Sequence, residues 1–205
     1  MQVENWVVLK NTNISWGSVS RFFHWGVLII IAVQIPLGFW MVEVYEVYAE
    51  TYADDTWVMR TSRVHHTLGF LLLAVVCMRI SWRAANPTPD LPATLVNYQR
   101  WLARGTHVLL YALLIVYPLS GWASLSAYEG EFPIFFFGWD SMPRLVPQVA
   151  EEATFNYDFF ATIHRWCWRI GGAVLGLHIF GALWHHYIAK DGILRRMLFG
   201  RQPDS

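Results

Sequence analysis

The 205-residue sequence has few charged residues and few cysteines. Asp, Glu, Lys and Arg make up only 15% of the chain, whereas hydrophobic residues make up 55%. This balance favours a protein that crosses a membrane several times over a soluble domain, and we expect no nucleic-acid partner. The two cysteines, Cys77 and Cys167, are expected to differ in membrane depth by about 13 Å. Because a disulfide needs Cα atoms within about 7 Å, we expect two small, buried, unpaired thiols.

Four stretches are apolar over about the 20 residues that a membrane-spanning helix requires. They are residues 21–42, 65–83, 106–125 and 160–188. The sequence shows no low-complexity tract and no sign of a second domain. We therefore expect an all-α fold, a transmembrane four-helix bundle that forms a single membrane domain over residues 1–205.

Basic residues are scarce in the first and third connections between these stretches. The acidic residues there are Glu43, Glu46, Glu50, Asp54, Asp55, Glu129, Glu131, Asp140, Glu151, Glu152 and Asp158, against Arg60, Arg63 and Arg144. The N-terminal arm, the second connection and the C-terminal tail carry most of the other Lys and Arg residues. Because positive charge accumulates in cytoplasmic segments, we expect both termini in the cytoplasm.

His164 and His178 lie fourteen residues apart in the fourth stretch. Fourteen helical steps return to nearly the same helix face and span roughly 21 Å, which places the two imidazoles at two depths of the bilayer. Ionisable side chains inside a membrane are costly and indicate a function. The pair therefore predicts two metal centres at different depths.

The same spacing recurs in the other three stretches. Fourteen residues separate His24 from Gly38, His65 from Arg79 and His107 from Gly121. Since consecutive helices run in opposite directions, these residues fall into two layers. A cytoplasmic layer holds His24, Arg79, His107 and His178, and an outer layer holds Gly38, His65, Gly121 and His164.

Two histidines in each layer favour haem as the bound group. Haem iron accepts imidazole axially, and a haem with two such ligands needs one histidine from each of two helices at equal depth. The pairs His65 with His164 and His24 with His178 meet this condition, whereas catalytic zinc usually takes a third protein ligand. No Cys-x-x-Cys-His motif is present for covalent attachment, so we expect two non-covalent b-type haems.

Three further residues each allow more than one role. His66 faces about 100° away from His65, so only one of them can be a ligand, and Arg79 on the face of His65 favours His65. His107 is an interhelical hydrogen-bond partner, a contact of a quinone or a propionate, or a ligand in place of another histidine. Arg79 pairs with a haem propionate or extends toward the membrane interface.

The chain resembles the prokaryotic cytochrome b561 family, part of a wider group with b-type cytochrome subunits of hydrogenases and formate dehydrogenases. The residues that carry the resemblance are Arg21-Phe22-Phe23-His24-Trp25, His65-His66-Thr67-Leu68-Gly69 with Arg79, His107 with Tyr111 and Pro118, His164, Gly176-Leu177-His178, His185-His186-Tyr187 and Lys190-Asp191. The resemblance implies a four-helix di-haem protein in which His24 pairs with His178 and His65 with His164.

The resemblance also implies a function in a bacterial cytoplasmic membrane. It implies a quinone-linked oxidoreductase that moves electrons between a periplasmic donor and membrane quinone. Two alternatives are a haem-bearing anchor subunit of a larger redox complex and a superoxide:quinone oxidoreductase. The acidic outer connections disfavour anionic superoxide unless Arg63, Arg165 and Arg169 form a local basic site. The acidic surface suits a basic periplasmic redox protein or a partner subunit.

Overall fold

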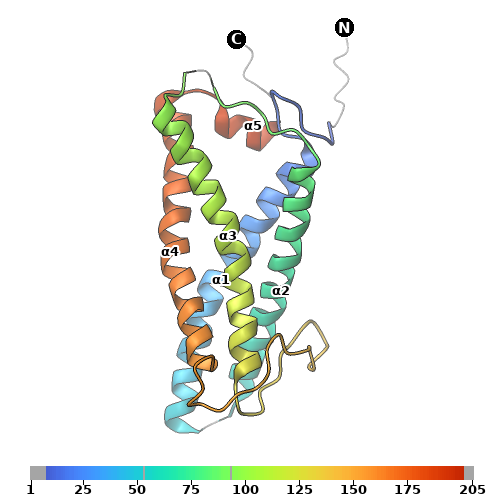
Figure 1. Ribbon diagram of the computed structural model, residues 1–205, viewed down its shortest axis with the longest axis vertical. Helices are drawn as coiled ribbons and strands as arrows, with labels where there is room; N and C mark the ends of the chain where they lie inside the picture. The colour runs from blue at the N-terminus through green and yellow to red at the C-terminus, as the bar shows by residue number, and fades with distance from the viewer. Residues whose placement is uncertain (1–7, 53, 93, 201–205) are drawn as a thin grey trace. The chain divides into compact units, whose positions relative to one another are not determined.

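The protein is all-α in the part that the computed structural model describes, residues 8–52, 54–92 and 94–200 (Figure 1). The elements are α1 (Ser18–Thr51), α2 (Thr56–Ala84), α3 (Asn97–Ala127), α4 (Tyr157–Trp184), the π-helical segment η1 (His185–Ala189) and α5 (Ile193–Phe199). Within the described ranges, the β-type pairing is limited to two isolated bridges between α3 and α4. Four helices are long and apolar enough to cross a membrane, the fourth being α4 continued by η1. The predicted fold class is confirmed.

Helices α1, α2 and α3 are longer than the apolar stretches that predicted them. Helix α1 continues for nine residues beyond Val42 and carries Glu43, Glu46 and Glu50, all exposed. Glutamate is a good helix former, so this part of the first connection has no local reason to leave the helix. The helix ends before Tyr52, whose φ of 50° lies in the left-handed region. The first connection is therefore short.

Helix α2 begins at Thr56, where a side chain of the preceding connection caps it. The Asp54 carboxylate accepts hydrogen bonds from the backbone N–H and the hydroxyl of Thr56. Such a carboxylate satisfies a free donor at the start of a helix, and the same bonds lower the pKa of Asp54. Asn156 caps α4 in a similar way by accepting a hydrogen bond from the N–H of Phe159.

The chain forms two compact units, and each contains a length of all four long helices. Unit 1 comprises Met1–Gly26, Val75–Ala112 and Gly171–Ser205, and unit 2 comprises Val27–Ala74 and Leu113–Ile170. In unit 1, side chains of α1, α2, α3 and α4 meet around His178. In unit 2, the same four helices meet around His164, with aromatic contacts between α2 and α3 and between α1 and α4.

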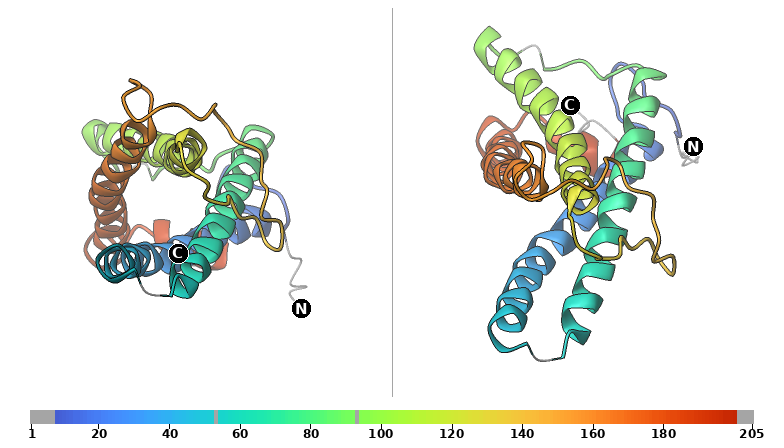
Figure 2. Two further views of the ribbon diagram at one scale, coloured as in Figure 1. Left: turned by 90° about the horizontal axis from the view of Figure 1, so that it is seen from below. Right: turned by 60° about the horizontal axis from the view of Figure 1, so that its bottom comes forward.

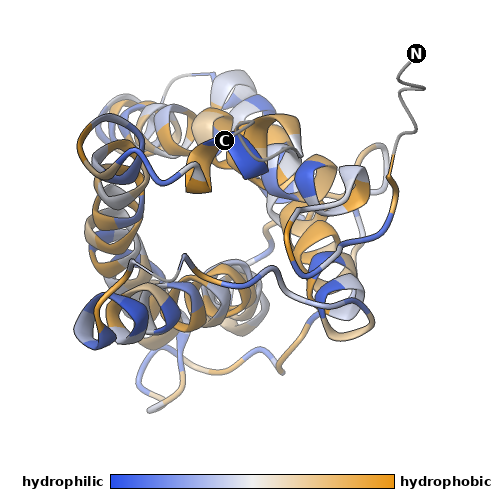
Figure 3. Ribbon diagram, turned by 90° about the horizontal axis from the view of Figure 1, so that it is seen from above, coloured by the Kyte–Doolittle hydropathy of each residue, from blue (hydrophilic) through white to orange (hydrophobic). Residues whose placement is uncertain are grey.

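Many large apolar side chains of the helices are exposed, and the apolar residues are coloured orange along the ribbon in Figure 3. Phe22, Val108 and Phe180 are each at least 66% exposed, which suits contact with lipid tails better than contact with water. Both cysteines are free, as expected. The expectation that both are buried is wrong for Cys77, which is exposed on α2 and borders a groove with Phe23, Met78 and Trp82. Its polarisable thiol is compatible with an apolar surround, so burial against protein is not required.

The connection between α3 and α4 folds back onto α2 and the end of α3 (Figure 2). The Arg144 guanidinium donates to the carbonyls of Leu125 and Ser126, which satisfies acceptors at the C-terminus of α3. On the other side, the Phe137 N–H donates to the Thr67 hydroxyl of α2. This connection therefore packs against α2 and α3 within unit 2, where it contacts His66.

Candidate functional site

In unit 1, His24 of α1 and His178 of α4 face each other. Their ring centres lie 6.2 Å apart, with an angle of 68° between the ring planes. Two imidazoles that bind one metal ion from opposite sides, each through a nitrogen at about 2 Å, have ring centres roughly 6 Å apart. The separation of these two rings therefore fits a metal ion held between them.

Arg79 of α2 contacts His24 and Tyr111 of α3. Its guanidinium lies 3.0 Å from His24 Nδ1 and donates to the Tyr111 hydroxyl, also at 3.0 Å. Because a guanidinium only donates, His24 Nδ1 is the acceptor in this arrangement, and the proton of the neutral ring lies on Nε2. Metal binding through Nε2 as a neutral imidazole therefore requires Arg79 to turn to another acceptor.

His107 of α3 also contacts His178, but in a different geometry. The two ring centres are 5.1 Å apart in an edge-to-face arrangement, which is shorter than a metal-bridged pair requires. His107 Nδ1 lies 2.6 Å from the Ala103 carbonyl oxygen, to which it donates. The Nε2 atom of His107 is left as the acceptor of this ring.

In unit 2, His65 of α2 and His164 of α4 form the second facing pair. Their ring centres lie 6.3 Å apart at 73°, close to the values for His24 and His178. His65 Nδ1 is buried and has no hydrogen-bond partner within the described part of the chain. An unsatisfied nitrogen in an apolar interior is costly, and a bound metal or cofactor group would relieve that cost.

The ring of His164 is held by α3. Its Nδ1 donates to the Tyr117 carbonyl at 2.9 Å, and the Tyr117 ring centre lies 4.1 Å from the His164 ring centre. A carbonyl that binds one nitrogen of a ligand histidine fixes the tautomer and leaves the other nitrogen for the metal. Gly121 permits this position, since a Cβ there would lie 2.9 Å from His164 Cε1. A Cβ at Gly38 would lie 3.6 Å from His65 Cε1, an ordinary contact.

His66 points away from the facing pair. Its ring stacks on Phe135 with centres 5.7 Å apart, and its Nδ1 accepts a hydrogen bond from the Phe135 N–H at 3.4 Å. His66 thus contacts the connection between α3 and α4, whereas His65 contacts His164. His65, not His66, therefore lies opposite His164, and the choice of His65 as the ligand stays a prediction.

We expect His66→Ala to leave all bound haem in place, because the substitution removes a contact of the connection and no donor of the facing pair. Haem per chain, measured by the pyridine haemochrome assay on purified protein, checks this result. Loss of haem from a folded His66→Ala protein would move the ligand role from His65 to His66.

Arg63, Arg165 and Arg169, the candidates for a local basic site, each have a partner close by in the chain or in the connection between α3 and α4. The Arg63 guanidinium forms a two-pronged ion pair with Asp140, and this hydrogen bonding lowers the pKa of Asp140. Arg165 donates to the Thr162 hydroxyl, and the Arg169 guanidinium lies over the Trp166 ring. Each arginine is therefore engaged locally, and the charge of Arg63 is neutralised.

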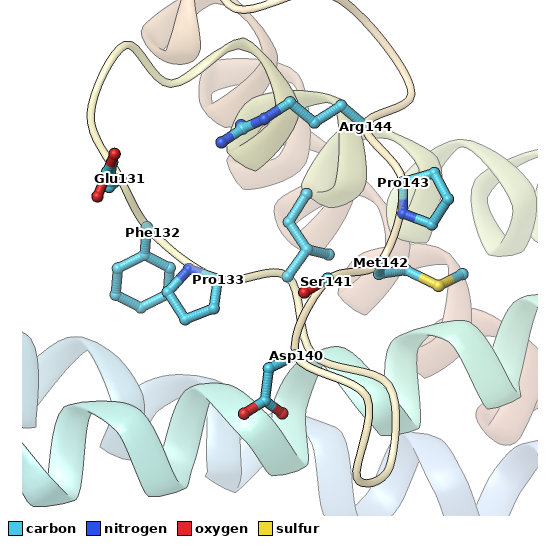
Figure 4. A pocket seen from close by; sticks show the side chains of 9 residues that line it. Glu131, Phe132, Pro133, Asp140, Ser141, Met142, Pro143 and Arg144 are labelled. Atoms are coloured by element: carbon cyan, nitrogen blue, oxygen red, sulfur yellow. The ribbon is translucent and has the colours of Figure 1, made fainter.

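One hollow lies in the connection between α3 and α4. It has a volume of about 560 Å³ and is bordered by Glu131, Asp140 and Arg144 among others (Figure 4). It contains no histidine or cysteine. Moreover, within residues 8–52, 54–92 and 94–200, three or more His, Cys, Asp or Glu side chains nowhere converge as a metal site. The donor sets are histidine pairs, which suit haem better than zinc.

Some residues at the two sites were not anticipated from the sequence. Tyr117 and Gln34 bind the backbone or ring of a facing histidine pair, Gln34 through a 3.0 Å bond from its amide to the His65 carbonyl. His185 of η1 is 17% exposed and paired with Asp191. The His–Asp spacing of six residues across a turn was the available signal for that pair.

Comparisons with known proteins agree on one group. The family model described as prokaryotic cytochrome b561 matches residues 15–200. Cytochrome b561 homolog 2 of Escherichia coli (strain K12) is 34% identical over 190 residues, which cover 92% of this chain and 93% of the relative. A probable superoxide oxidase CybB of Yersinia pestis is 27% identical, covering 85% and 90%. Cytochrome b561 homolog 1 of Escherichia coli (strain K12) is 26% identical, covering 89% and 96%.

Proposed function

The chain belongs to the prokaryotic cytochrome b561 family, and from this premise we propose that it holds two b-type haems in series and passes electrons between a donor and membrane quinone. As a member, it is a multi-pass bacterial membrane protein and a b-type cytochrome of electron transfer. The observation that carries the proposal is the presence of two facing histidine pairs, with ring centres 6.2 Å and 6.3 Å apart.

His24 with His178, and His65 with His164, are the proposed axial ligands. Each pair joins two different helices, and each ring pair has the separation of a bis-imidazole metal site. A haem bound there supplies a one-electron carrier whose iron changes oxidation state. The surrounding apolar helices exclude water, and the Tyr117 carbonyl orients one ligand ring.

Arg79 is proposed to bind a haem propionate. Its present bond to His24 Nδ1 conflicts with neutral ligation through Nε2, because Nδ1 would then carry the hydrogen and the guanidinium cannot accept a hydrogen bond. A propionate is an anionic acceptor that suits the planar fork of arginine. Arg79 would keep its bond to the Tyr111 hydroxyl through Nε while its terminal nitrogens pair with the carboxylate.

The proposed orientation has both termini in the cytoplasm, so that the His24 and His178 pair lies toward the cytoplasm and the His65 and His164 pair toward the periplasm. The support is the excess of Lys and Arg in the terminal segments and the second connection. The acidic residues of α1 and of the connection between α3 and α4 then face the periplasm, where they suit a basic donor protein.

His107 is proposed to contact the quinone near the His24 and His178 pair. Its Nδ1–H is held by the Ala103 carbonyl, so Nε2 is an acceptor for a hydroxyl of a reduced quinone. After taking that proton, the same atom is a donor to a quinone carbonyl. The ring lies within a cluster with His178 and needs no metal bond to account for its position.

We expect His107→Ala to keep both haem spectra and to slow the reaction with quinone about 10²-fold or more, the usual contribution of a positioned proton-transfer group. Stopped-flow oxidation of the reduced haems by a soluble quinone measures the rate. Loss of a haem would make His107 a ligand. An unchanged rate would make it a structural residue and place the quinone elsewhere.

Superoxide is the second candidate donor, since one relative is named a probable superoxide oxidase. The exposed acidic residues and the pairing of Arg63 with Asp140 work against the capture of an anion. Haem reduction by enzymatically generated superoxide, with superoxide dismutase as the control, tests this donor. An anchor subunit, in contrast, would co-purify with a partner subunit and would not reduce quinone alone.

A further inference from the structure

Helix α5 connects the end of α4 to the start of α1 within unit 1 (Figure 1). At the α4 side, His185 Nδ1 lies 2.6 Å from an Asp191 carboxylate oxygen, and the two side chains are only 17% and 8% exposed. The carboxylate only accepts, so His185 donates. The second Asp191 oxygen accepts the Ile193 N–H at the first residue of α5. Asp191 therefore fastens α5 to the end of the fourth membrane helix.

At the other side, α5 binds α1 through its C-terminal carbonyls. The Trp25 indole N–H donates to the Met197 carbonyl at 3.2 Å, and the Arg21 guanidinium donates to the Leu198 carbonyl at 3.0 Å. These carbonyls have no partner inside the helix, and a cation is favoured at this end of the helix dipole. Gly200, with φ of 71°, lets Arg21 pack close, since a Cβ there would lie 3.1 Å from Arg21 Cζ.

The two helices that α5 joins are those that carry His24 and His178. Trp25 follows His24, and the two rings are in edge contact with centres 5.2 Å apart. His185 lies seven residues after His178, two helical turns along the same chain segment. A change in the position of α5 would thus move the two histidines relative to each other.

We propose that α5, locked by the His185–Asp191 pair and the Trp25–Met197 hydrogen bond, is a strap that sets the spacing of His24 and His178. His185, Asp191 and Trp25 are positioning residues that act through this spacing. The inference rests on the proposed haem between His24 and His178, but it concerns what determines the geometry of that site.

Asp191→Ala and Trp25→Phe test the strap in the full-length purified protein. Trp25→Phe removes one N–H donor and keeps an aromatic ring, so it remains informative if Asp191→Ala does not fold. The readouts are a redox titration of both haems and the low-temperature electron paramagnetic resonance spectrum of the oxidised protein. We expect the midpoint potential and the signal of the haem between His24 and His178 to shift, while those of the haem between His65 and His164 stay unchanged.

Three further variants sharpen the test. His186→Ala, next to His185, leaves both haems unchanged. Asp191→Asn gives a smaller shift than Asp191→Ala, because its amide oxygen still accepts from His185. The double variant Asp191→Ala/Trp25→Phe shifts the potential by less than the sum of the two single shifts, because both act through one element.

Unchanged potentials and spectra in both single variants would overturn the strap, and so would equal shifts of both haems, which indicate a general loosening of the protein. Failure of the proposed function is distinguishable. It shows in the unsubstituted protein, as a haem content below two per chain, or in a His24→Ala variant that keeps all its haem.

Discussion

His164→Ala is expected to remove one of the two haems and leave the other. The substitution deletes one of two facing rings in unit 2, so that His65 would be left as the only histidine ligand of that haem. His24 and His178 belong to unit 1 and keep their own spacing. The haem content therefore falls to half, and the redox difference spectrum loses one component. His65→Ala is expected to give the same result from the other side of the pair.

Added imidazole provides the control for His164→Ala. A free imidazole fits the space that the deleted ring leaves and restores the missing spectrum if the loss is one of ligation. A folded variant that lacks both haems would contradict the assignment of one histidine pair to each haem. A folded variant that keeps both would exclude His164 as a ligand.

Gly121→Ala is expected to have the second-largest effect. The added methyl group would lie 2.9 Å from Cε1 and 3.1 Å from Nδ1 of His164, so the ring or the helix must shift. The Tyr117 carbonyl and ring hold His164 from the same helix, which leaves the ring little freedom to move. We expect the haem of unit 2 to be lost in most molecules, whereas the haem of unit 1 remains.

Gly105→Ala is the matched control, since Gly105 lies in the same helix and no atom lies within 4 Å of a Cβ built there. Alanine is also preferred over glycine in a helix by about 1 kcal/mol. This variant should keep both haems and unfold at the same or a higher temperature. Equal haem contents in Gly121→Ala and Gly105→Ala would show that His164 does not need the space beside Gly121.

The positions of the four helices follow from apolar length, because lipid selects for a continuous run of apolar residues. Their ends do not follow from it. Glu43, Glu46 and Glu50 interrupt the apolar run but not the helix. Glutamate is a good helix former, so the helix continues with exposed glutamates where it leaves the bilayer. The start of α2 depends instead on Asp54, which caps it by a local hydrogen bond.

Helix periodicity was sufficient to group the histidines but not to describe their surroundings. The spacing of fourteen residues predicts shared faces and depths, and the rings of His65 and His164 do lie 6.3 Å apart. The contact of His66 with Phe135 depends on how a long connection folds back, which no periodicity encodes. The same holds for the bond between Arg79 and His24, which depends on the side-chain conformation of a long arginine.

The haem content of the purified protein tests the central claim most directly. The pyridine haemochrome assay, combined with a protein determination, gives the type of haem and the number per chain. We predict a b-type spectrum and two haems per chain, because each of the two facing histidine pairs binds one. A single haem per chain, or a c-type spectrum, would contradict the account.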